Sequence, residues 1–181
     1  MTYSIVLADP PWTFKVWNAA KSKNHVSHKY NLMSVDEIGK LSIPASENCA
    51  LFLWATWPNL KDAFDILNYW EFTYRTLAWV WVKLNRNSMG FFHGNGYYTR
   101  SNTEPCLLAV RGNMPVAAHD VQALICSPVR QHSRKPDEQY AKIERLYPQG
   151  RYLEMFARRK HSERWDVWGN EVESDVEITG C

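Results

Sequence analysis

A carboxylate, two consecutive prolines and a large aromatic ring follow one another at Asp9, Pro10, Pro11 and Trp12. Each proline lacks a backbone N–H and forces the preceding residue into an extended conformation, so this stretch is rigid and presents acceptors rather than donors. One carboxylate, backbone carbonyls and an aromatic ring suit a flat ligand that donates hydrogen bonds, such as the amino group of adenine or cytosine. The alternative interpretation is a Pro-Pro turn that merely ends a strand.

The element that positions this tetrapeptide is the apolar run over residues 3–8, which predicts a buried strand ending directly before Asp9. A second apolar run over residues 49–54 predicts another buried strand. The expected helices are one opened by a capping box at 34–37 with Val35, Ile38 and Leu41 on one face, one starting at Pro58 with Leu60, Phe64 and Leu67 inward, and one from Pro136 to about Tyr147. The other β-rich segments are 73–83, 105–110 and 151–157.

This alternation of strands and helices predicts an α/β sheet with helices on both faces and ligands at the carboxyl ends of its strands. A loop of about twenty residues separates the segments 73–83 and 105–110, and loops of that length are usually functional. A nucleotide-binding fold usually carries a glycine-rich turn after its first strand, whereas the G-x-G pattern of this chain, at 94–96, lies inside the long loop. We therefore predict a Rossmann-like fold that is circularly permuted, with the catalytic half N-terminal and the cofactor half C-terminal.

The composition mainly excludes classes of protein. A chain of 181 residues suffices for one domain with a sizeable core. No apolar stretch reaches the roughly 18 residues of a membrane span, and no signal-peptide pattern is present. The cysteines form no C-x-x-C pair, so we expect reduced thiols in a cytoplasmic protein, three of them in core strands, and neither a zinc site nor a disulfide framework. They are Cys49, Cys106, Cys126 and Cys181.

The net charge is only +2, but basic residues concentrate in three segments. Residues 10–35 hold four lysines and two histidines and no acid, and further basic clusters lie at 130–135 and 158–164. Three such segments that converged in space would form a phosphate-binding surface, whereas separately each would be a solvated loop. His25 and His28 have no carboxylate near them in the sequence, which argues against a metal site.

Together these motifs resemble the adenine-N(6) methyltransferases that carry a DPPW motif. That family includes the catalytic subunit of the eukaryotic mRNA adenosine methyltransferase and many small bacterial and phage DNA enzymes. The resemblance spans nearly the whole chain. Besides the tetrapeptide, it rests on the segments Tyr30-Asn31-Leu32-Met33-Ser34, Thr99-Arg100-Ser101-Asn102-Thr103-Glu104-Pro105 (typical of the bacterial branch), Ser133-Arg134-Lys135-Pro136-Asp137-Glu138, Glu154-Met155-Phe156-Ala157-Arg158-Arg159 and Trp165-Asp166-Val167-Trp168-Gly169-Asn170-Glu171.

The resemblance implies methyl transfer from S-adenosylmethionine to the exocyclic 6-amino group of adenine, without a metal. Asp9 and the Pro10 carbonyl would accept the two N–H bonds of that amine, and Trp12 and Tyr30 would orient the base. Positioning of this kind supplies roughly 7–11 kcal/mol of a barrier reduction. The implied catalytic residues are Asp9, Pro10, Pro11 and Trp12, and the implied substrate-binding residues are Trp12, Lys29, Tyr30, Arg100 and Asn102.

The resemblance also implies a cofactor site. Lys135 and Arg158 are natural partners for the carboxylate of S-adenosylmethionine. Glu104 has two interpretations, as a ligand of cofactor or base and as an acid on an edge strand. Asp137 and Glu138 are explained as first-turn acids favoured by the helix dipole and are left outside the site. The implied cofactor-binding residues are Asp9, Ser133, Lys135, Glu154, Arg158, Asn170 and Glu171.

The chain departs from eukaryotic members at 159–161, where a different loop sequence puts the ribose contacts of that stretch in doubt. We expect a single methyltransferase domain over residues 1–181, with no separate target-recognition domain and an acidic tail over 172–181. The expected partner is nucleic acid, with DNA favoured over RNA and single strands over duplex, because flipping a paired base costs energy. A homodimer or a partner subunit would extend the binding surface. The alternatives are the same chemistry on RNA adenosine or on the cytosine 4-amino group, and an inactive nucleic-acid-binding subunit.

Overall fold

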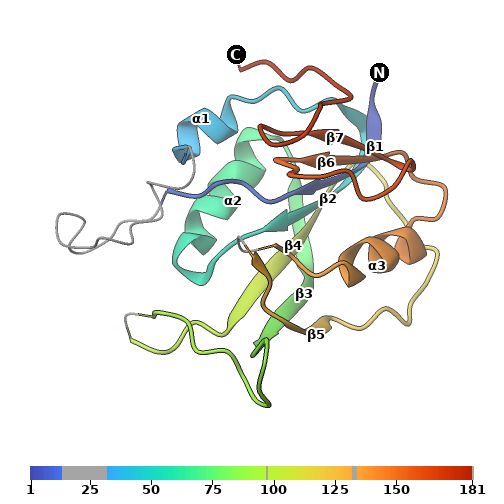
Figure 1. The fold of residues 1–181 in the computed structure, drawn as a ribbon. Coiled ribbons are helices and arrows are strands. Elements are labelled where there is room, and N and C mark those ends of the chain that lie inside the picture. The colour runs from blue at the N-terminus through green and yellow to red at the C-terminus, as the bar shows by residue number, and fades with distance from the viewer. Residues whose placement is uncertain (14–31, 97, 132–133, 181) are drawn as a thin grey trace.

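The computed structural model describes residues 1–13, 32–96, 98–131 and 134–180, whose strands form one seven-stranded sheet (Figure 1). The strand order across the sheet is β5-β3-β4-β2-β1-β6-β7. The elements in chain order are β1 (Tyr3–Ala8), α1 (Val35–Gly39), β2 (Ala45–Trp54), the 3-10 turn η3 (Trp57–Asn59), α2 (Leu60–Tyr69), β3 (Thr73–Leu84), β4 (Thr103–Arg111), β5 (Leu124–Pro128), α3 (Glu138–Leu146), β6 (Tyr152–Met155) and β7 (Trp165–Trp168).

Most strands of the sheet run parallel. β1 pairs in parallel with β2 and β6, β6 with β7, and β3 with β5, whereas β4 is antiparallel to both of its neighbours, β2 and β3. Parallel strands are buried on both faces, which explains why the β1 and β2 segments read as continuous apolar runs. The predicted α/β, Rossmann-like fold is confirmed, and the circular permutation stays a prediction.

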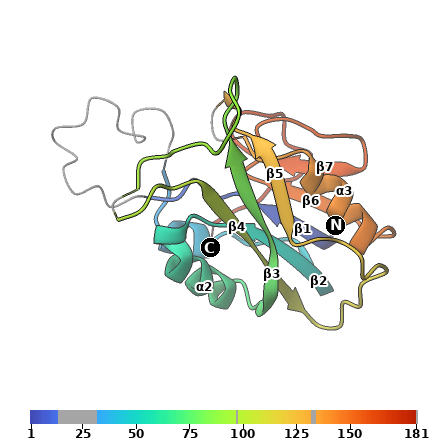
Figure 2. The same cartoon turned by 90° about the horizontal axis from the view of Figure 1, so that it is seen from below.

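Helices cover both faces of the sheet, as Figures 1 and 2 show, with α1 and α2 on one face and α3 on the other. Successive side chains of a strand point to opposite faces, so β1 contributes to two hydrophobic cores. Val6 packs in the core that contains Ile38 of α1 and Ile66 of α2. Ile5 packs in the core that contains Ile143 of α3. The central strand therefore fixes both layers, and with them the position of its own carboxyl end.

The start of α1 forms as predicted. The Ser34 hydroxyl oxygen accepts from the Glu37 N–H at 3.3 Å, and the Glu37 carboxylate accepts from the Ser34 N–H at 2.7 Å, which completes the capping box. Such a box satisfies two backbone donors that a helix start otherwise leaves unpaired. Among the described residues, no helix has the length and the apolar character that crossing a membrane requires.

Two expectations about packing were wrong. Phe64 lies at the surface, edge-on against Tyr74, because α2 begins at Leu60 after the 3-10 turn and buries Ala63 and Ile66 together with Leu67, which was expected to face inward. Cys126 lies on a strand as expected, but that strand is β5 at the end of the sheet and the side chain is exposed, while Cys49 and Cys106 are buried. The bounds of β5 and the strand β7 were not predicted from the sequence.

Candidate active site

A cavity of about 1330 Å³ lies at the edge of the sheet where the central parallel strands end. Asp9 follows β1, Ala55 follows β2, Phe156 follows β6 and Gly169 follows β7, and all four residues line the cavity. In open α/β sheets this edge is where ligands bind. The cavity is larger than the roughly 300–1,000 Å³ that one small ligand occupies, so it has room for two ligands next to each other.

The antiparallel pair β3 and β4 adds an acidic and a basic group to the same edge. Because it runs against β2, its first residues lie where the other strands end, and Glu104 there pairs with Trp81 of β3. β3 runs toward this edge, and Lys83 lies on it two residues after Trp81. β4 lies between β3 and β2, so the interpretation of Glu104 as an acid on an edge strand is wrong.

Asp9 and Lys135 form the central ion pair of the cavity. The Lys135 ammonium lies 2.8 Å from each carboxylate oxygen of Asp9 and 5.4 Å from the ring centroid of Trp54. The Asp9 side chain keeps about a third of its surface exposed, whereas that of Lys135 is 11% exposed. A carboxylate has about four lone-pair directions, so Asp9 retains acceptor capacity toward the cavity while Lys135 fixes its orientation.

Glu104 and Lys83 continue this pair into a buried chain of alternating charges. Lys83 donates to Glu104 at 2.5 Å, and Lys135 lies 3.3 Å from the other carboxylate oxygen. Burial raises the pKa of Glu104, but the ammonium groups of Lys135 and Lys83 outweigh it and hold the pKa below its usual value. Burial lowers the pKa of Lys135, and the charges of Asp9 and Glu104 reverse this and raise it. Glu104 and Lys135 therefore keep their charges.

Trp12 forms part of the cavity wall rather than a freely exposed stacking face. It is only 4% exposed, and its indole N–H donates to the Trp54 carbonyl at 3.1 Å. The Pro10 carbonyl, which the sequence suggested as a bare acceptor, already accepts from the Trp12 N–H at 2.9 Å. One lone pair of that carbonyl remains for a ligand.

Glu154 lies in the wall beside α3. It accepts from the Tyr140 hydroxyl at 2.9 Å, and the ring of Tyr140 stacks on His161 with centroids 3.7 Å apart. Burial raises the pKa of Glu154 to about 7; the Tyr140 hydrogen bond opposes this rise and the charge of Asp9 adds to it. The loop at 159–161, whose sequence differs from that of the eukaryotic members, therefore supports Glu154 indirectly, because His161 stacks on Tyr140. The sequence did not reveal this contact.

The opposite part of the cavity combines aromatic surface with polar groups. Phe156 packs edge-on against Trp168 with centroids 5.4 Å apart. Phe156 has φ 62°, a left-handed conformation that is strained for a bulky residue and that concentrates at functional sites. Arg158 lies 3.5 Å from Glu171, and both line the cavity together with Asn170. The sequence offered no signal for the strain at Phe156.

Three arginines converge on one carboxylate at the start of α3. Arg130 donates to Asp137 at 2.5 Å, Arg134 donates to it at 2.8 Å, and Arg159 forms a further ion pair with it. Burial raises the pKa of Asp137, but these guanidinium groups outweigh it and lower the pKa below its usual value. The interpretation of Asp137 as only a first-turn acid is therefore incomplete, since its partners all line the cavity.

The structure brings most of the predicted site residues to the cavity. Arg100 and Asn102 do not line it: Arg100 is exposed, and the Asn102 carbonyl accepts from the Lys83 N–H at 2.8 Å. Lys29, Tyr30, Ser133, His25 and His28 lie outside the described residues. The predicted residues that line the cavity are Asp9, Pro10, Pro11, Trp12, Lys135, Glu154, Arg158, Asn170 and Glu171.

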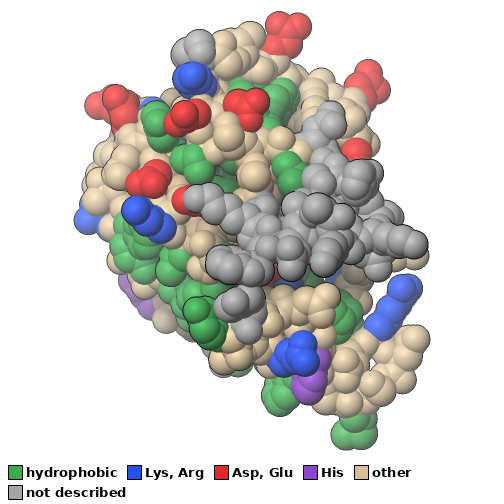
Figure 3. Space-filling view, turned by 90° about the vertical axis from the view of Figure 1, so that its left-hand side faces the viewer, with side chains coloured by type: hydrophobic (Ala, Val, Ile, Leu, Met, Phe, Trp, Pro, Cys, Tyr) green, Lys and Arg blue, Asp and Glu red, His purple; other side chains and the backbone are tan. Residues whose placement is uncertain are grey.

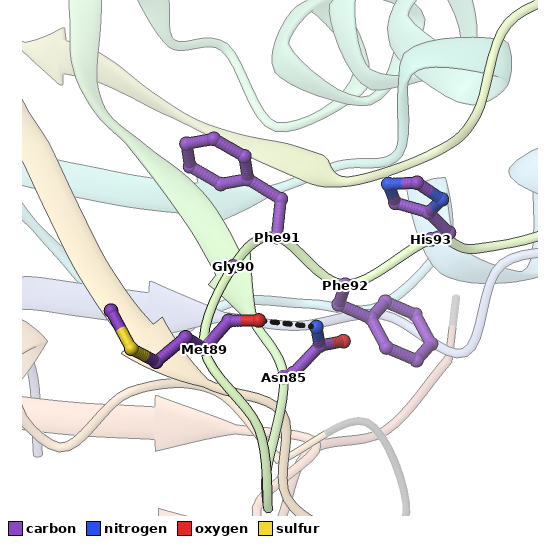
Figure 4. A pocket seen from close by; sticks show the side chains of 6 residues that line it. All are labelled: Asn85, Met89, Gly90, Phe91, Phe92 and His93. Atoms are coloured by element: carbon purple, nitrogen blue, oxygen red, sulfur yellow. Dashed lines mark hydrogen bonds between the residues drawn. The ribbon is translucent and has the colours of Figure 1, made fainter.

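The loop between β3 and β4 extends beyond the sheet and forms a second, shallow hollow of about 500 Å³ (Figure 4). Phe91 and Phe92 project to opposite sides of the chain there, and the Asn85 amide donates to the Met89 carbonyl at 3.4 Å. On the face in Figure 3, acidic side chains gather toward the end of the molecule away from this loop, whereas basic and hydrophobic side chains occur at both ends. Arg86 links the loop to the large cavity.

Within residues 1–13, 32–96, 98–131 and 134–180, no group of three or more His, Cys, Asp or Glu side chains is placed to hold a metal ion. The absence of a metal from the reaction stays a prediction.

The fold and the position of the cavity are those of the Rossmann-like methyltransferases. The model of the MT-A70 family matches residues 3–171, and the chain therefore belongs to this family. It is 31% identical over 196 residues to the type II methyltransferase M.MunI of a Mycoplasma species, covering 97% of this chain and 81% of that protein.

Eukaryotic proteins also match. The chain is 33% identical over 174 residues to an N(6)-adenosine-methyltransferase MT-A70-like protein of Arabidopsis thaliana, covering 94% of this chain and 24% of that protein. It is 31% identical over 175 residues to the N(6)-adenosine-methyltransferase catalytic subunit METTL3 of Homo sapiens, covering 94% of this chain and 28% of that protein. The chain thus spans about a quarter of the length of these two relatives.

Proposed function

We propose that this chain transfers the methyl group of S-adenosylmethionine to the exocyclic 6-amino group of adenine in DNA. The observation that carries the proposal is the Asp9 carboxylate, which ends β1 inside the cavity, is oriented by Lys135 at 2.8 Å and keeps acceptor capacity toward the open space. An acceptor held in this way selects a ligand that donates hydrogen bonds, which is what an exocyclic amine does.

The cavity fits the cofactor as well as the base. S-adenosylmethionine supplies a methyl group on a positively charged sulfur. Phe156 and Trp168 offer apolar faces for its adenine ring, and Glu154 offers an acceptor for ribose hydroxyls. Arg158 and Asn170 offer donors for its carboxylate, and Asp9 adds negative charge on the side where the sulfonium would lie. We assign the cofactor to the half of the cavity bounded by β6 and β7.

The residues of the chain would promote the reaction mainly by positioning. Asp9 and the free lone pair of the Pro10 carbonyl would accept the two N–H bonds of the amine, which favours the pyramidal geometry in which the nitrogen lone pair is released from the ring. The buried wall of Trp12 and Trp54 would keep the base in one plane. Orientation of this kind is worth roughly 7–11 kcal/mol. Proton loss can follow transfer, so Asp9 acts as an acceptor rather than a strong base.

The choice of DNA rests on the resemblance of residues 99–105 to the bacterial branch of the family. The match with M.MunI, which extends over 81% of that protein, supports the same branch, whereas the matches with the plant and human relatives cover about a quarter of each. The expected single domain without a separate target-recognition domain belongs to this proposal. Sequence selectivity would then come from loops or from a second subunit.

The test is methyl transfer from labelled S-adenosylmethionine to matched single-stranded DNA, duplex DNA and RNA, followed by digestion to nucleosides. We expect label in N(6)-methyldeoxyadenosine, with single-stranded DNA the best substrate. Label in a methylated ribonucleoside would show that RNA is the substrate, and label in methylated cytosine would show that the cytosine 4-amino group is the acceptor. Either result would overturn DNA adenine as the target. No label in any nucleoside, with nucleic-acid binding retained, would indicate an inactive binding subunit.

A matched pair of variants isolates the chemistry. We expect Asp9→Ala to abolish transfer while leaving the fold and cofactor binding largely intact. Glu163→Ala is the control, because this acid has a 96% exposed side chain and does not line the cavity. Full activity of Asp9→Ala would overturn the mechanism.

A further inference from the structure

The arginine cluster, defined as Arg130, Arg134 and Arg159 around Asp137, has more positive charge than its internal partner neutralises. Three guanidinium groups contact a single carboxylate, which leaves a net charge of +2. A guanidinium carries five N–H donors, and a carboxylate has about four acceptor sites to share among all three. The cluster therefore has more charged donors than the Asp137 carboxylate can accept from.

The Lys135 and Glu104 side chains lie deeper than the cluster. The cluster side chains are 34–41% exposed and that of Asp9 is 36% exposed, whereas those of Lys135 and Glu104 are 11% and 8% exposed. All three arginines nevertheless line the same cavity as Asp9. The cluster thus occupies the rim of the cavity, and the Lys135–Glu104 pair, to which Asp9 is joined, forms its floor.

A nucleotide whose base reaches the floor leaves its backbone phosphates at the rim. Arginine is the side chain best suited to phosphate, because its planar fork donates two parallel hydrogen bonds. We propose that the arginine cluster binds a phosphodiester of the target strand next to the methylated nucleotide. This inference rests on the proposed function and adds to it the group that holds the strand.

The competing anion is the carboxylate of the cofactor. It carries one charge, and the family resemblance assigns Lys135 and Arg158 to it, of which Arg158 lies on the β6 side of the cavity. A cluster with a net charge of +2 at the rim suits the repeated negative charges of a nucleic-acid strand better than a single carboxylate. The two ligands share oxyanion chemistry, so the experiment must separate them.

The probe is a fluorescent single-stranded oligodeoxythymidylate with one adenine, whose binding is measured by anisotropy over a range of salt concentrations in the presence of S-adenosylhomocysteine. For Arg134→Gln and for Arg159→Gln we expect the slope of log K against log salt to fall by about 0.7, which corresponds to about fivefold weaker binding at 0.1 M salt. Arg134→Lys keeps the charge and should lose less. Arg145→Gln is the control, because Arg145 pairs with Asp120 at the surface and does not line the cavity.

A chemical change in the probe locates the contact. Replacing the phosphodiester next to the adenine by a neutral methylphosphonate should weaken binding to the unmodified protein, and should have no further effect in the Arg134→Gln, Arg159→Gln double variant. Weaker binding of S-adenosylhomocysteine with unchanged oligonucleotide binding would assign the cluster to the cofactor and overturn the proposal. An unchanged salt slope in all arginine variants would overturn it too.

The outcome is separable from that of the proposed function, because binding is measured without transfer. Transfer to adenine with unchanged strand binding in the variants would refute the phosphate contact and leave the function standing. Loss of binding in the variants of a protein that methylates nothing would refute the function and leave the contact standing. A matched RNA probe shows whether the contact depends on the sugar.

Discussion

The Lys135 ammonium lies 2.8 Å from both carboxylate oxygens of Asp9, although 126 residues separate the two in the sequence. The family resemblance implied that Lys135 binds the carboxylate of the cofactor, whereas its nearest anions in the structure are Asp9 and Glu104. These two roles predict different kinetic effects. A residue that orients Asp9 affects the transfer step, and a residue that holds the cofactor affects cofactor affinity.

We expect Lys135→Gln to lower kcat by about 100-fold or more, because preorganised electrostatic groups at a reacting centre contribute on that order. The dissociation constant of S-adenosylhomocysteine should change less than about threefold, a difference of under 1 kcal/mol. Single-turnover transfer and calorimetric titration measure the two quantities. A large loss of cofactor affinity with kcat preserved would return Lys135 to the role that the resemblance implied.

Substitutions in the buried ion pair of Lys83 and Glu104 should have strong and non-additive effects on the free energy of unfolding. Glu104→Gln leaves two buried ammonium groups with one carboxylate fewer, and breaking a buried pair costs about 3–5 kcal/mol. Adding Lys83→Met removes one of the stranded charges, so the double variant should be more stable than Glu104→Gln alone. Urea unfolding of the single and double variants gives the coupling energy. Additive losses would show that the two side chains do not interact in solution.

Glu154 predicts a pH dependence of folding stability. Its pKa is raised from 4.5 to about 7, so the folded state binds its proton more tightly than the unfolded state. The corresponding stability is fully present below pH 4.5 and is lost as the pH rises through 7, a change of roughly 2–3 kcal/mol. Urea unfolding at pH 5 and pH 8 should therefore show a larger loss in the natural chain than in Glu154→Gln.

Tyr140→Phe provides the matched control for this prediction. The Tyr140 hydroxyl donates to Glu154 and opposes the rise of its pKa, so removing the hydroxyl should move the loss of stability to higher pH. A Glu154→Gln variant whose stability follows pH like that of the natural chain would assign the effect to other groups.

The parts of the site that the sequence predicted are those coded by adjacent residues. The apolar run before Asp9 predicts both the strand and its end, because two prolines stop the regular structure there. Lys83 and Asp137 were not predicted, because their contacts depend on the antiparallel return of β4 and on arginines that come from two separate segments. Phe64 was placed in the core because periodicity gives the spacing of a helical face but not its exact rotation, which the 3-10 turn sets.

The chain segments that follow β6 and β7 approach each other closely in the cavity wall at Gly169. A Cβ atom at this position would overlap the carbonyl oxygen of Ala157, whose N–H donates to the Trp168 carbonyl at 2.9 Å. Gly169→Ala should therefore displace the ends of both strands, cost about 1–3 kcal/mol of stability and weaken cofactor binding. Gly180→Ala is the control, because a Cβ there meets no atom within 4 Å. Thermal unfolding and cofactor titration of the two variants measure both effects. Equal stability and equal cofactor affinity of Gly169→Ala and Gly180→Ala would contradict the prediction.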